Sequence, residues 1–348
     1  MRWWTIADRV QLSRPLAIAL GDPAGIGSEI VAKAWDARSE AGLPTFFCVG
    51  DPRSVSAVWD GPVEVVTGPA GAQACFGHAL PVIELPALAP AVPGKPDLAG
   101  ARCALDSLEL ALGLTRSGAA AALVTAPVSK AQLYAIGFSH AGQTEFVAER
   151  CGVGRDNIAM MLAGPTLRTV PVTTHVALAD VPGLLNRALI LARAHAALRG
   201  LSRDFGIAHP RLAIAGLNPH AGEGGALGHE EIDIIAPAIA ELQAEGHDVT
   251  GPHAADTMFH PRARAGYDAA LCLYHDQALI PLKALHFDDG VNLTLGLPIV
   301  RTAPDHGTAF AMAGMNMAEP GAMIAAIRMA AECATRRMEA AAVCAKAA

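Results

Sequence analysis

Short apolar runs alternate along this chain with longer stretches that have helical spacing. Each apolar run is bounded by glycine, proline or polar residues, which is typical of a buried strand in a largely parallel sheet. The clearest runs are 15–20, 45–49, 63–66, 121–126, 168–174, 212–219 and 268–274. Helical spacing of apolar residues covers 28–37, 101–116, 186–199, 230–245 and 321–342. Strands that alternate with helices in this way predict βαβ units and an α/β fold.

The composition limits the class of protein. A chain of 348 residues is too long for one simple core and favours two domains. Apolar residues make up 52% of the chain, yet no run reaches the roughly 18 to 20 uninterrupted apolar residues of a membrane span. The net charge is -7 and the basic residues are scattered, so the chain lacks the basic stripe of a nucleic-acid-binding protein. We therefore expect neither a membrane nor a nucleic acid as partner.

The cysteines and the N-terminus indicate the compartment. Seven widely spaced cysteines without a C-x-x-C pair are typical of reduced thiols in a cytoplasmic protein. Residues 1–14 lack the apolar core of a signal peptide and are expected to form an extension before the first strand. We therefore expect a cytoplasmic location.

Three histidines stand directly after apolar runs of the same kind. His175, His220 and His275 follow the runs 168–174, 212–219 and 268–274, respectively. In open α/β sheets, ligands bind at the carboxyl ends of the strands, where these three imidazoles would meet. Three neutral imidazoles in a cleft suit a divalent metal that keeps a position open for substrate. The sequence therefore predicts a metal site formed by these three side chains.

The remaining polar candidates near this site have ordinary interpretations as well. Asp276 directly follows His275 and could orient an imidazole or a bound water, whereas Asp256 could act in catalysis or cap a turn. Outside the predicted trio, we expect most histidines to be ordinary side chains. These are His78, His140, His195, His209, His247, His253, His260 and His286.

Two loops rich in glycine lie between a predicted strand and a predicted helix. The loop 218–225 contains Gly222 and Gly224, whose backbone N–H groups could form a concavity for an anion such as a cofactor phosphate. A merely flexible loop is the alternative. The loop 21–27 departs from the dinucleotide pattern G-x-G-x-x-G, because Ile30 stands where the last glycine belongs.

Polar residues embedded in apolar segments mark a second group of candidates. Lys283, Asn292 and Arg301 would be explained by a phosphate or carboxylate ligand. The alternative is that the two cations pair with local carboxylates, namely Asp288, Asp289 and Asp305. The loop that begins with Asp305 and His306 could bind an adenosine moiety or simply start a helix.

Taken together, these segments resemble the family of 4-hydroxythreonine-4-phosphate dehydrogenases, which serve pyridoxal phosphate biosynthesis. The similarity covers nearly the whole chain, and the segments that carry it are 21–27, 142–146, 173–175, 216–225, 274–277, 290–298 and 302–308. The resemblance implies a fold like that of isocitrate and isopropylmalate dehydrogenases, with two α/β domains, an active site in the cleft and a homodimer. We place the first domain at 15–140 plus 306–348 and the second at 141–305.

The resemblance also implies roles for individual residues. His175, His220 and His275 would be the metal ligands, shared between subunits, and four further positions match substrate contacts. These positions are Thr144, Lys283, Asn292 and Arg301. The family motif usually reads Gly-His-Thr-Glu, whereas Gln143 replaces its histidine here. Glutamine can donate a hydrogen bond to a phosphate or carboxylate, but it carries no charge and shuttles no proton.

The resemblance implies metal-dependent oxidation of 4-phosphooxy-L-threonine with NAD or NADP. The product, 2-amino-3-oxo-4-phosphooxybutanoate, would decarboxylate to 3-amino-2-oxopropyl phosphate. The metal would lower the pKa of the substrate hydroxyl, and the protein would position the nicotinamide. Lys283 could donate a proton or place a charge near the carboxylate. The metal can be zinc, magnesium, manganese or cobalt.

Three alternatives remain open. A paralogous dehydrogenase of a phosphorylated sugar acid, threonate or erythronate 4-phosphate, would share every motif above. A metal-dependent hydrolase could use the same three histidines with a bound water and would need no nicotinamide. A non-catalytic protein that binds phosphorylated metabolites would be stabilised by its ligand without turnover.

Overall fold

The computed structural model describes residues 12–85 and 90–347, and most of the expected N-terminal extension, residues 1–11, lies outside them. The chain divides into two compact units. The terminal unit is formed by the described residues of 12–151 and by Pro298–Met338, and the central unit by Gly152–Leu297 with the described residues from 339 onward. The segments 141–151 and 298–305, which we expected in the second domain, therefore belong to the terminal unit.

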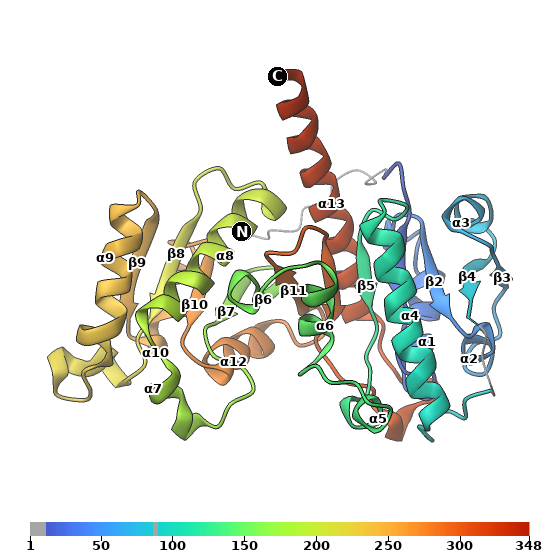
Figure 1. Ribbon diagram of the computed structural model, residues 1–348, viewed down its shortest axis with the longest axis horizontal. Coiled ribbons are helices and arrows are strands. Elements are labelled where there is room, and N and C mark those ends of the chain that lie inside the picture. The colour runs from blue at the N-terminus through green and yellow to red at the C-terminus, as the bar shows by residue number, and fades with distance from the viewer. Residues whose placement is uncertain (1–11, 86–89, 348) are drawn as a thin grey trace. The chain divides into compact units, whose positions relative to one another are not determined.

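The terminal unit contains parallel strands in the order β3-β4-β2-β1-β5-β12. The strands are β1 (Leu16–Ala19), β2 (Phe46–Gly50), β3 (Val63–Val65), β4 (Leu80–Glu84), β5 (Leu123–Thr125) and β12 (Arg301–Pro304). The helices are α1 (Gly27–Asp36), α2 (Pro52–Ser56), α3 (Pro69–Cys75), α4 (Leu98–Arg116), α5 (Lys130–Ala135), α6 (Gln143–Arg150) and most of α13 (Gly321–Ala347). Strands β1 and β2 are buried along their whole length, because helices such as α4 pack on them (Figure 1).

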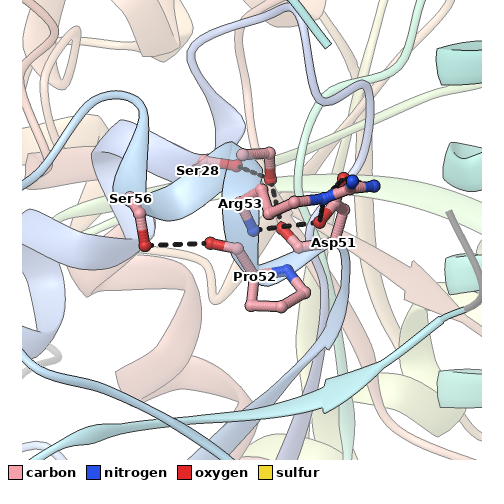
Figure 2. Close-up of polar contacts among 6 residues, drawn as sticks. Ser28, Asp51, Pro52, Arg53 and Ser56 are labelled. Carbon is pink, nitrogen blue, oxygen red and sulfur yellow. Dashed lines mark hydrogen bonds and ion pairs between the residues drawn. The ribbon is translucent and has the colours of Figure 1, made fainter. Parts of the chain in front are cut away.

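Asp51 lies between the last residue of β2 and the first residue of α2 (Figure 2). Its carboxylate accepts a hydrogen bond from the backbone N–H of Arg53 at 2.9 Å and receives the guanidinium of the same residue at 3.0 and 3.1 Å. Ser54 donates to the Asp51 carbonyl at 2.7 Å and bonds Ser28 of α1 at 2.9 Å. The carboxylate is thus the N-cap of α2 and fixes the strand exit, and the contact between Ser54 and Ser28 joins α2 to α1.

The central unit contains strands in the order β11-β6-β7-β10-β8-β9. They are β6 (Ala159–Gly164), β7 (Leu167–Pro171), β8 (Arg211–Ala215), β9 (Asp248–His253), β10 (Ala269–Cys272) and β11 (Val291–Leu295). The helices are α7 (Val181–Leu184), α8 (Arg187–Phe205), α9 (Ala236–Ala244), α10 (Ala255–Met258), α11 (Pro261–Arg264) and α12 (His275–Leu285). Strands β7, β10, β8 and β9 are parallel, whereas β6 runs antiparallel to both β7 and β11.

The predicted strands and helices are confirmed in type and place, and the α/β fold with a largely parallel sheet is confirmed. The antiparallel strands β6 and β11 were not predicted. Strand β6 turns into β7 through a tight connection, since Gly164 pairs with Leu167. A hairpin of this kind needs no crossover helix, so it escapes a search for strands that alternate with helices.

In the part of the chain that the structure describes, no helix combines the length and apolar character needed to cross a membrane.

Candidate functional site

The three predicted histidines follow strands that are neighbours in the sheet. Strand β10 lies between β7 and β8 and is parallel to both, so the carboxyl ends of these strands share one edge. His175 follows β7, His220 follows β8 and His275 follows β10. Contrary to expectation, none of the three directly follows its strand, because β7 ends at Pro171, β8 at Ala215 and β10 at Cys272. His275 is instead the first residue of α12. The sheet topology therefore brings all three to one edge of the central unit.

His175 and His275 face each other at this edge. Their ring centroids are 5.6 Å apart, with an angle of 44° between the ring planes. Both line a hollow of about 230 Å³, whose other lining residues are Thr173, Val176, Leu178, Val181, Tyr274 and Asp276. Two imidazoles and one carboxylate thus open into a hollow that is otherwise largely apolar.

Two of the three imidazoles contact a carboxylate that is close in sequence. Nδ1 of His275 lies 2.7 Å from Oδ1 of Asp276, and Nδ1 of His220 lies 3.0 Å from Oε2 of Glu223. An imidazole that donates from Nδ1 to a carboxylate presents the lone pair of Nε2, which is the usual arrangement of histidine ligands of metals. The contact of Asp276 with His275 is the one that its predicted orienting role needs, whereas the contact of Glu223 with His220 was not predicted.

The backbone at two of these histidines is left-handed. His175 has a φ of 53° and His220 a φ of 54°. Such a conformation costs a non-glycine residue roughly 1 to 2 kcal/mol, and strained backbone concentrates at functional sites. The fold therefore holds both imidazoles in place at a cost in stability.

His220 stands apart from the other two in one respect. Among the described residues, the group of possible ligands whose atoms all lie within 4.8 Å of one another is His195, Glu245 and His247, not the predicted trio. His220 begins a run of left-handed residues that continues through Gly225. The structure thus pairs His175 with His275 and carries His220 on a separate loop.

The glycine loop 218–225 is already occupied in part by a carboxylate of the chain itself. Oε1 of the buried Glu231 accepts hydrogen bonds from the backbone N–H groups of Leu217 and Asn218, both at 2.7 Å. A Cβ at Gly222, where φ is 80°, would lie 2.6 Å from Oε2 of Glu231. The N–H groups at the strand exit are therefore taken by Glu231, whereas an anion site at the N–H groups of Gly222 and Gly224 stays a prediction. No spacing rule in the sequence pointed to Glu231 as the residue that binds the strand exit.

Arg301 is buried in the terminal unit and exposes only 4% of its surface. Nη2 donates to Oγ1 of Thr125 at 2.7 Å, and Nη1 to Oγ1 of Thr144 at 3.4 Å. Burial lowers the pKa of Arg301 to about 10, although the carboxylate of Glu145 partly opposes this effect. Arg301 thus keeps its charge at neutral pH beside Thr144, as expected for an anion contact.

Gln143 is the first residue of α6, beside Thr144. Its Nε2 donates to the carbonyl of Ala126 at 3.4 Å. Three of the residues predicted to contact substrate, Gln143, Thr144 and Arg301, therefore belong to one unit, and Arg301 lies beside Thr144.

The other predicted substrate and catalytic residues belong to the central unit. Asn292 lies on β11, and its Oδ1 is buried without a hydrogen-bond partner among the described residues. Nζ of Lys283, on α12, is 5.8 Å from the ring centroid of Phe287. Asp256 is exposed on α10. A buried acceptor such as Asn292 Oδ1 is costly unless a ligand satisfies it.

The loop that follows β12 carries Asp305 and His306. Nδ1 of His306 lies 3.1 Å from the carbonyl of Gly307. The carbonyl of Thr308 accepts from the N–H of Ile26 at 3.0 Å, so this loop packs on the loop 21–27 before α1. Two of the segments singled out in the sequence therefore adjoin each other in the terminal unit.

Fold and site define a two-unit α/β protein with imidazoles gathered at one sheet edge. A family model described as "Pyridoxal phosphate biosynthetic protein PdxA" matches residues 44–330. A 4-hydroxythreonine-4-phosphate dehydrogenase of Zymomonas mobilis subsp. mobilis is 56% identical over 324 residues, which cover 93% of this chain and 97% of that protein. One of Erythrobacter litoralis is 55% identical and covers 94% and 98%. The chain belongs to the PdxA family, as its sequence motifs predicted.

Solved structures agree with this assignment. A 4-hydroxythreonine-4-phosphate dehydrogenase of Klebsiella pneumoniae superposes with a TM-score of 0.83 at 37% identity, covering 92% of this chain and all of that one (100%). A terephthalate 1,2-cis-dihydrodiol dehydrogenase of Burkholderia xenovorans has a TM-score of 0.63 at 30% identity, covering 92% and 98%. The same fold thus occurs in relatives named for different substrates.

Proposed function

We propose that the chain oxidises 4-phosphooxy-L-threonine with NAD or NADP, dependent on one divalent metal ion per subunit. The product, 2-amino-3-oxo-4-phosphooxybutanoate, then loses carbon dioxide to give 3-amino-2-oxopropyl phosphate. The observation that carries the proposal is the group of histidines at one edge of the sheet, two of which contact a carboxylate through Nδ1. The chain also shares over half of its residues with an enzyme named for this reaction.

The donor set fits a divalent metal. His175, His220 and His275 would supply three nitrogen ligands, shared between the subunits of the proposed homodimer, and the contacts to Asp276 and Glu223 leave Nε2 of two of them available. When bound, the metal supplies Lewis acidity to the substrate hydroxyl and to the keto acid that decarboxylates. Zinc, magnesium, manganese and cobalt are the candidate ions, and imidazole ligands favour a transition metal.

Arg301 and Thr144 would bind the phosphate or the carboxylate of the substrate. Arg301 remains protonated well above neutral pH, and its position between two threonine hydroxyls limits its movement. Gln143 would add a neutral hydrogen bond at the start of α6. These residues bind and orient the anion, and none of them needs to transfer a proton.

In the central unit, Asn292 and Lys283 would act on the polar groups of the substrate. The buried Oδ1 of Asn292 would accept a hydrogen bond from a hydroxyl or an ammonium group. Lys283 would donate a proton or place its charge near the carboxylate, and Asp256 is the weaker candidate for proton transfer. Asp276 would hold the His275 ring in one tautomer.

The nicotinamide cofactor would contact the loop of Asp305 and His306, which adjoins the loop 21–27. Gly222 and Gly224 would approach it through backbone only, since Glu231 already takes the N–H groups of the strand exit.

We also propose a homodimer in the cytoplasm. Large exposed apolar residues on and after α12 support an interface, namely Ile280, Leu285 and Phe287. We expect Phe287→Glu to be a monomer by light scattering. A molar mass equal to that of a dimeric wild-type protein would argue against this interface.

The test measures formation of NADH or NADPH by the purified full chain with 4-phosphooxy-L-threonine, threonate 4-phosphate and erythronate 4-phosphate in parallel. We expect turnover with the threonine phosphate. Because Gln143 replaces the histidine that is usual in the family, the sugar acids are the second candidate, and a preference for them would make Gln143 a specificity marker. A preference for either sugar acid would select that candidate, and hydrolysis without nucleotide reduction would indicate a hydrolase.

A further inference from the structure

A second group of side chains of the types that bind metals lies in the central unit, away from the three predicted ligands. His195 lies within α8, and Glu245 and His247 lie in the turn between α9 and β9. Figure 1 shows α8, α9 and β9 in this unit. No sequence pattern connects His195 with Glu245, since fifty positions separate them.

The turn after α9 places two of these side chains together. Gly246 has a φ of 90°, and its N–H and that of His247 donate to the carbonyls of Gln243 and Leu242 at 3.0 Å each. This left-handed glycine ends the helix in the way typical of helix C-termini and fixes Glu245 and His247 on either side of it. An ion pair between Arg187 and Glu241, at 3.4 Å, further joins α8 to α9.

Both imidazoles approach the same carboxylate oxygen. Nε2 of His195 lies 2.6 Å from Oε2 of Glu245, and Nε2 of His247 lies 3.6 Å from it. The two ring centroids are 5.8 Å apart, and the three potential ligand atoms all lie within 4.8 Å of one another. The side chains are 30 to 40% exposed. Ligands of a tetrahedral zinc ion sit about 2.0 to 2.2 Å from the metal, so shifts available to half-exposed side chains suffice to admit an ion.

This cluster is distinct from the predicted active site. Strand β9 begins directly after His247 and runs parallel to β8. His247 therefore lies at the amino end of the strands, whereas His175, His220 and His275 follow the carboxyl ends of β7, β8 and β10. An ion bound by the cluster would lie at the opposite edge of the same sheet.

We propose that His195, Glu245 and His247 form a second binding site for a transition-metal ion of the zinc class. Two imidazole nitrogens and one carboxylate oxygen would bind the ion, and water would complete its coordination. An ion in this position would join α8 to the turn between α9 and β9 and stabilise the central unit. A simple ion pair of protonated histidines with Glu245 is the competing explanation, and it predicts no affinity for metal.

The test uses the full chain carrying His175→Gln and His275→Gln, which removes two ligands of the proposed active-site metal. Titration with Co²⁺, followed by visible absorption and by competition with Zn²⁺, measures binding. We expect one ion per chain in this background. Adding His195→Gln or His247→Gln should weaken binding at least about tenfold, because loss of even an outer partner of a metal ligand weakens affinity by about 10- to 100-fold. His209→Gln, at an exposed histidine of the same unit, is the matched control and should leave binding unchanged.

Two results would overturn the proposal. Either the background binds no ion, or the ion binds equally well after His195→Gln and His247→Gln. If the double background does not fold, the wild-type chain serves instead: the number of ions bound per chain should fall by one with His247→Gln and stay unchanged with His209→Gln. Failure of dehydrogenase activity would not bear on this result, because the measurement reports metal binding alone.

Discussion

His175 and His275 hold their rings 5.6 Å apart, each carried past the end of a different strand of the same parallel pair. Strand β7 pairs with β10 through Val170 and Leu271, so the two chain segments leave the sheet side by side. The relationship depends on strand register, because a shift by one residue would turn the following segment to the other face. The proposed metal site thus rests on the pairing of two buried apolar strands.

Asp276→Asn is expected to weaken binding of the proposed active-site metal by about 10- to 100-fold. The carboxylate lies 2.7 Å from Nδ1 of His275 and stabilises the tautomer that offers Nε2. Since the side chain is 68% exposed, the fold should be unaffected. Metal titration of the His247→Gln chain, which lacks the second proposed site, measures the change. Asp288→Asn, at an exposed carboxylate after α12, is the control, and equal affinities in both variants would refute the role of Asp276.

His220→Gly is expected to abolish metal-dependent turnover while it raises the free energy of unfolding by about 0.5 to 1 kcal/mol. Glycine adopts the left-handed backbone at φ 54° without strain, which raises the free energy of unfolding. Part of this gain is offset because glycine also increases the conformational entropy of the unfolded chain. Ala221→Gly, at φ 52°, should give a similar gain in stability with activity retained. Denaturant unfolding and steady-state rates measure both variants. A loss of stability in both would show that the left-handed backbone is not strained.

Arg301→Lys is expected to raise KM for the phosphorylated substrate by about 10- to 100-fold, corresponding to loss of about 1.4 to 2.7 kcal/mol from a charge-assisted contact. Lysine keeps the charge but cannot reach Thr125 and Thr144 with a planar group. Arg336→Lys, at an exposed position of α13, should leave KM unchanged. Because the pKa of Arg301 is about 10, its contribution to KM should be constant from about pH 6 to 9. This interpretation would be contradicted if the KM of the wild type rose with pH within that range and the KM of Arg301→Lys did not.

The central unit is expected to lose stability as the pH falls below about 6.5, in part through His253. Burial lowers the pKa of His253 below its ordinary value of 6.5. The unfolded chain therefore binds the proton more readily than the folded chain, so acid favours unfolding and the effect vanishes above the ordinary value. His253→Gln should flatten the decline of Tm between about pH 7.5 and 5, and His209→Gln should not. An identical slope in the wild type and His253→Gln would exclude this histidine as a source of the effect.

The strands that carry the site were predictable because burial on both faces leaves continuous apolar runs. Strands β8 and β10 are largely of this kind, whereas β7 is buried along its length but contains Arg168 and Thr169, and the three strands place the histidines at one edge. The direction of β11 was not predictable, since pairing of Val291 with Ala163 joins segments far apart in the chain. Local patterns carry no information on such pairing.

The side-chain partners of the site were harder to predict than its elements. Glu231 accepts hydrogen bonds from Leu217 and Asn218 because the chain turns back after Gly225, and no spacing rule in the sequence predicts that turn. His195 meets Glu245 only through the packing of α8 against α9. Asp276, in contrast, is adjacent to His275, and its contact was expected from the sequence.

The most direct test of the central claim is the initial rate of NADH or NADPH formation from 4-phosphooxy-L-threonine before and after chelation, with and without added Co²⁺ or Zn²⁺. Chelation should abolish the rate and added metal should restore it in the wild type, whereas His275→Gln should stay inactive under all conditions. A rate that survives chelation, or full activity of folded His275→Gln, would contradict the assignment of these histidines to a catalytic metal.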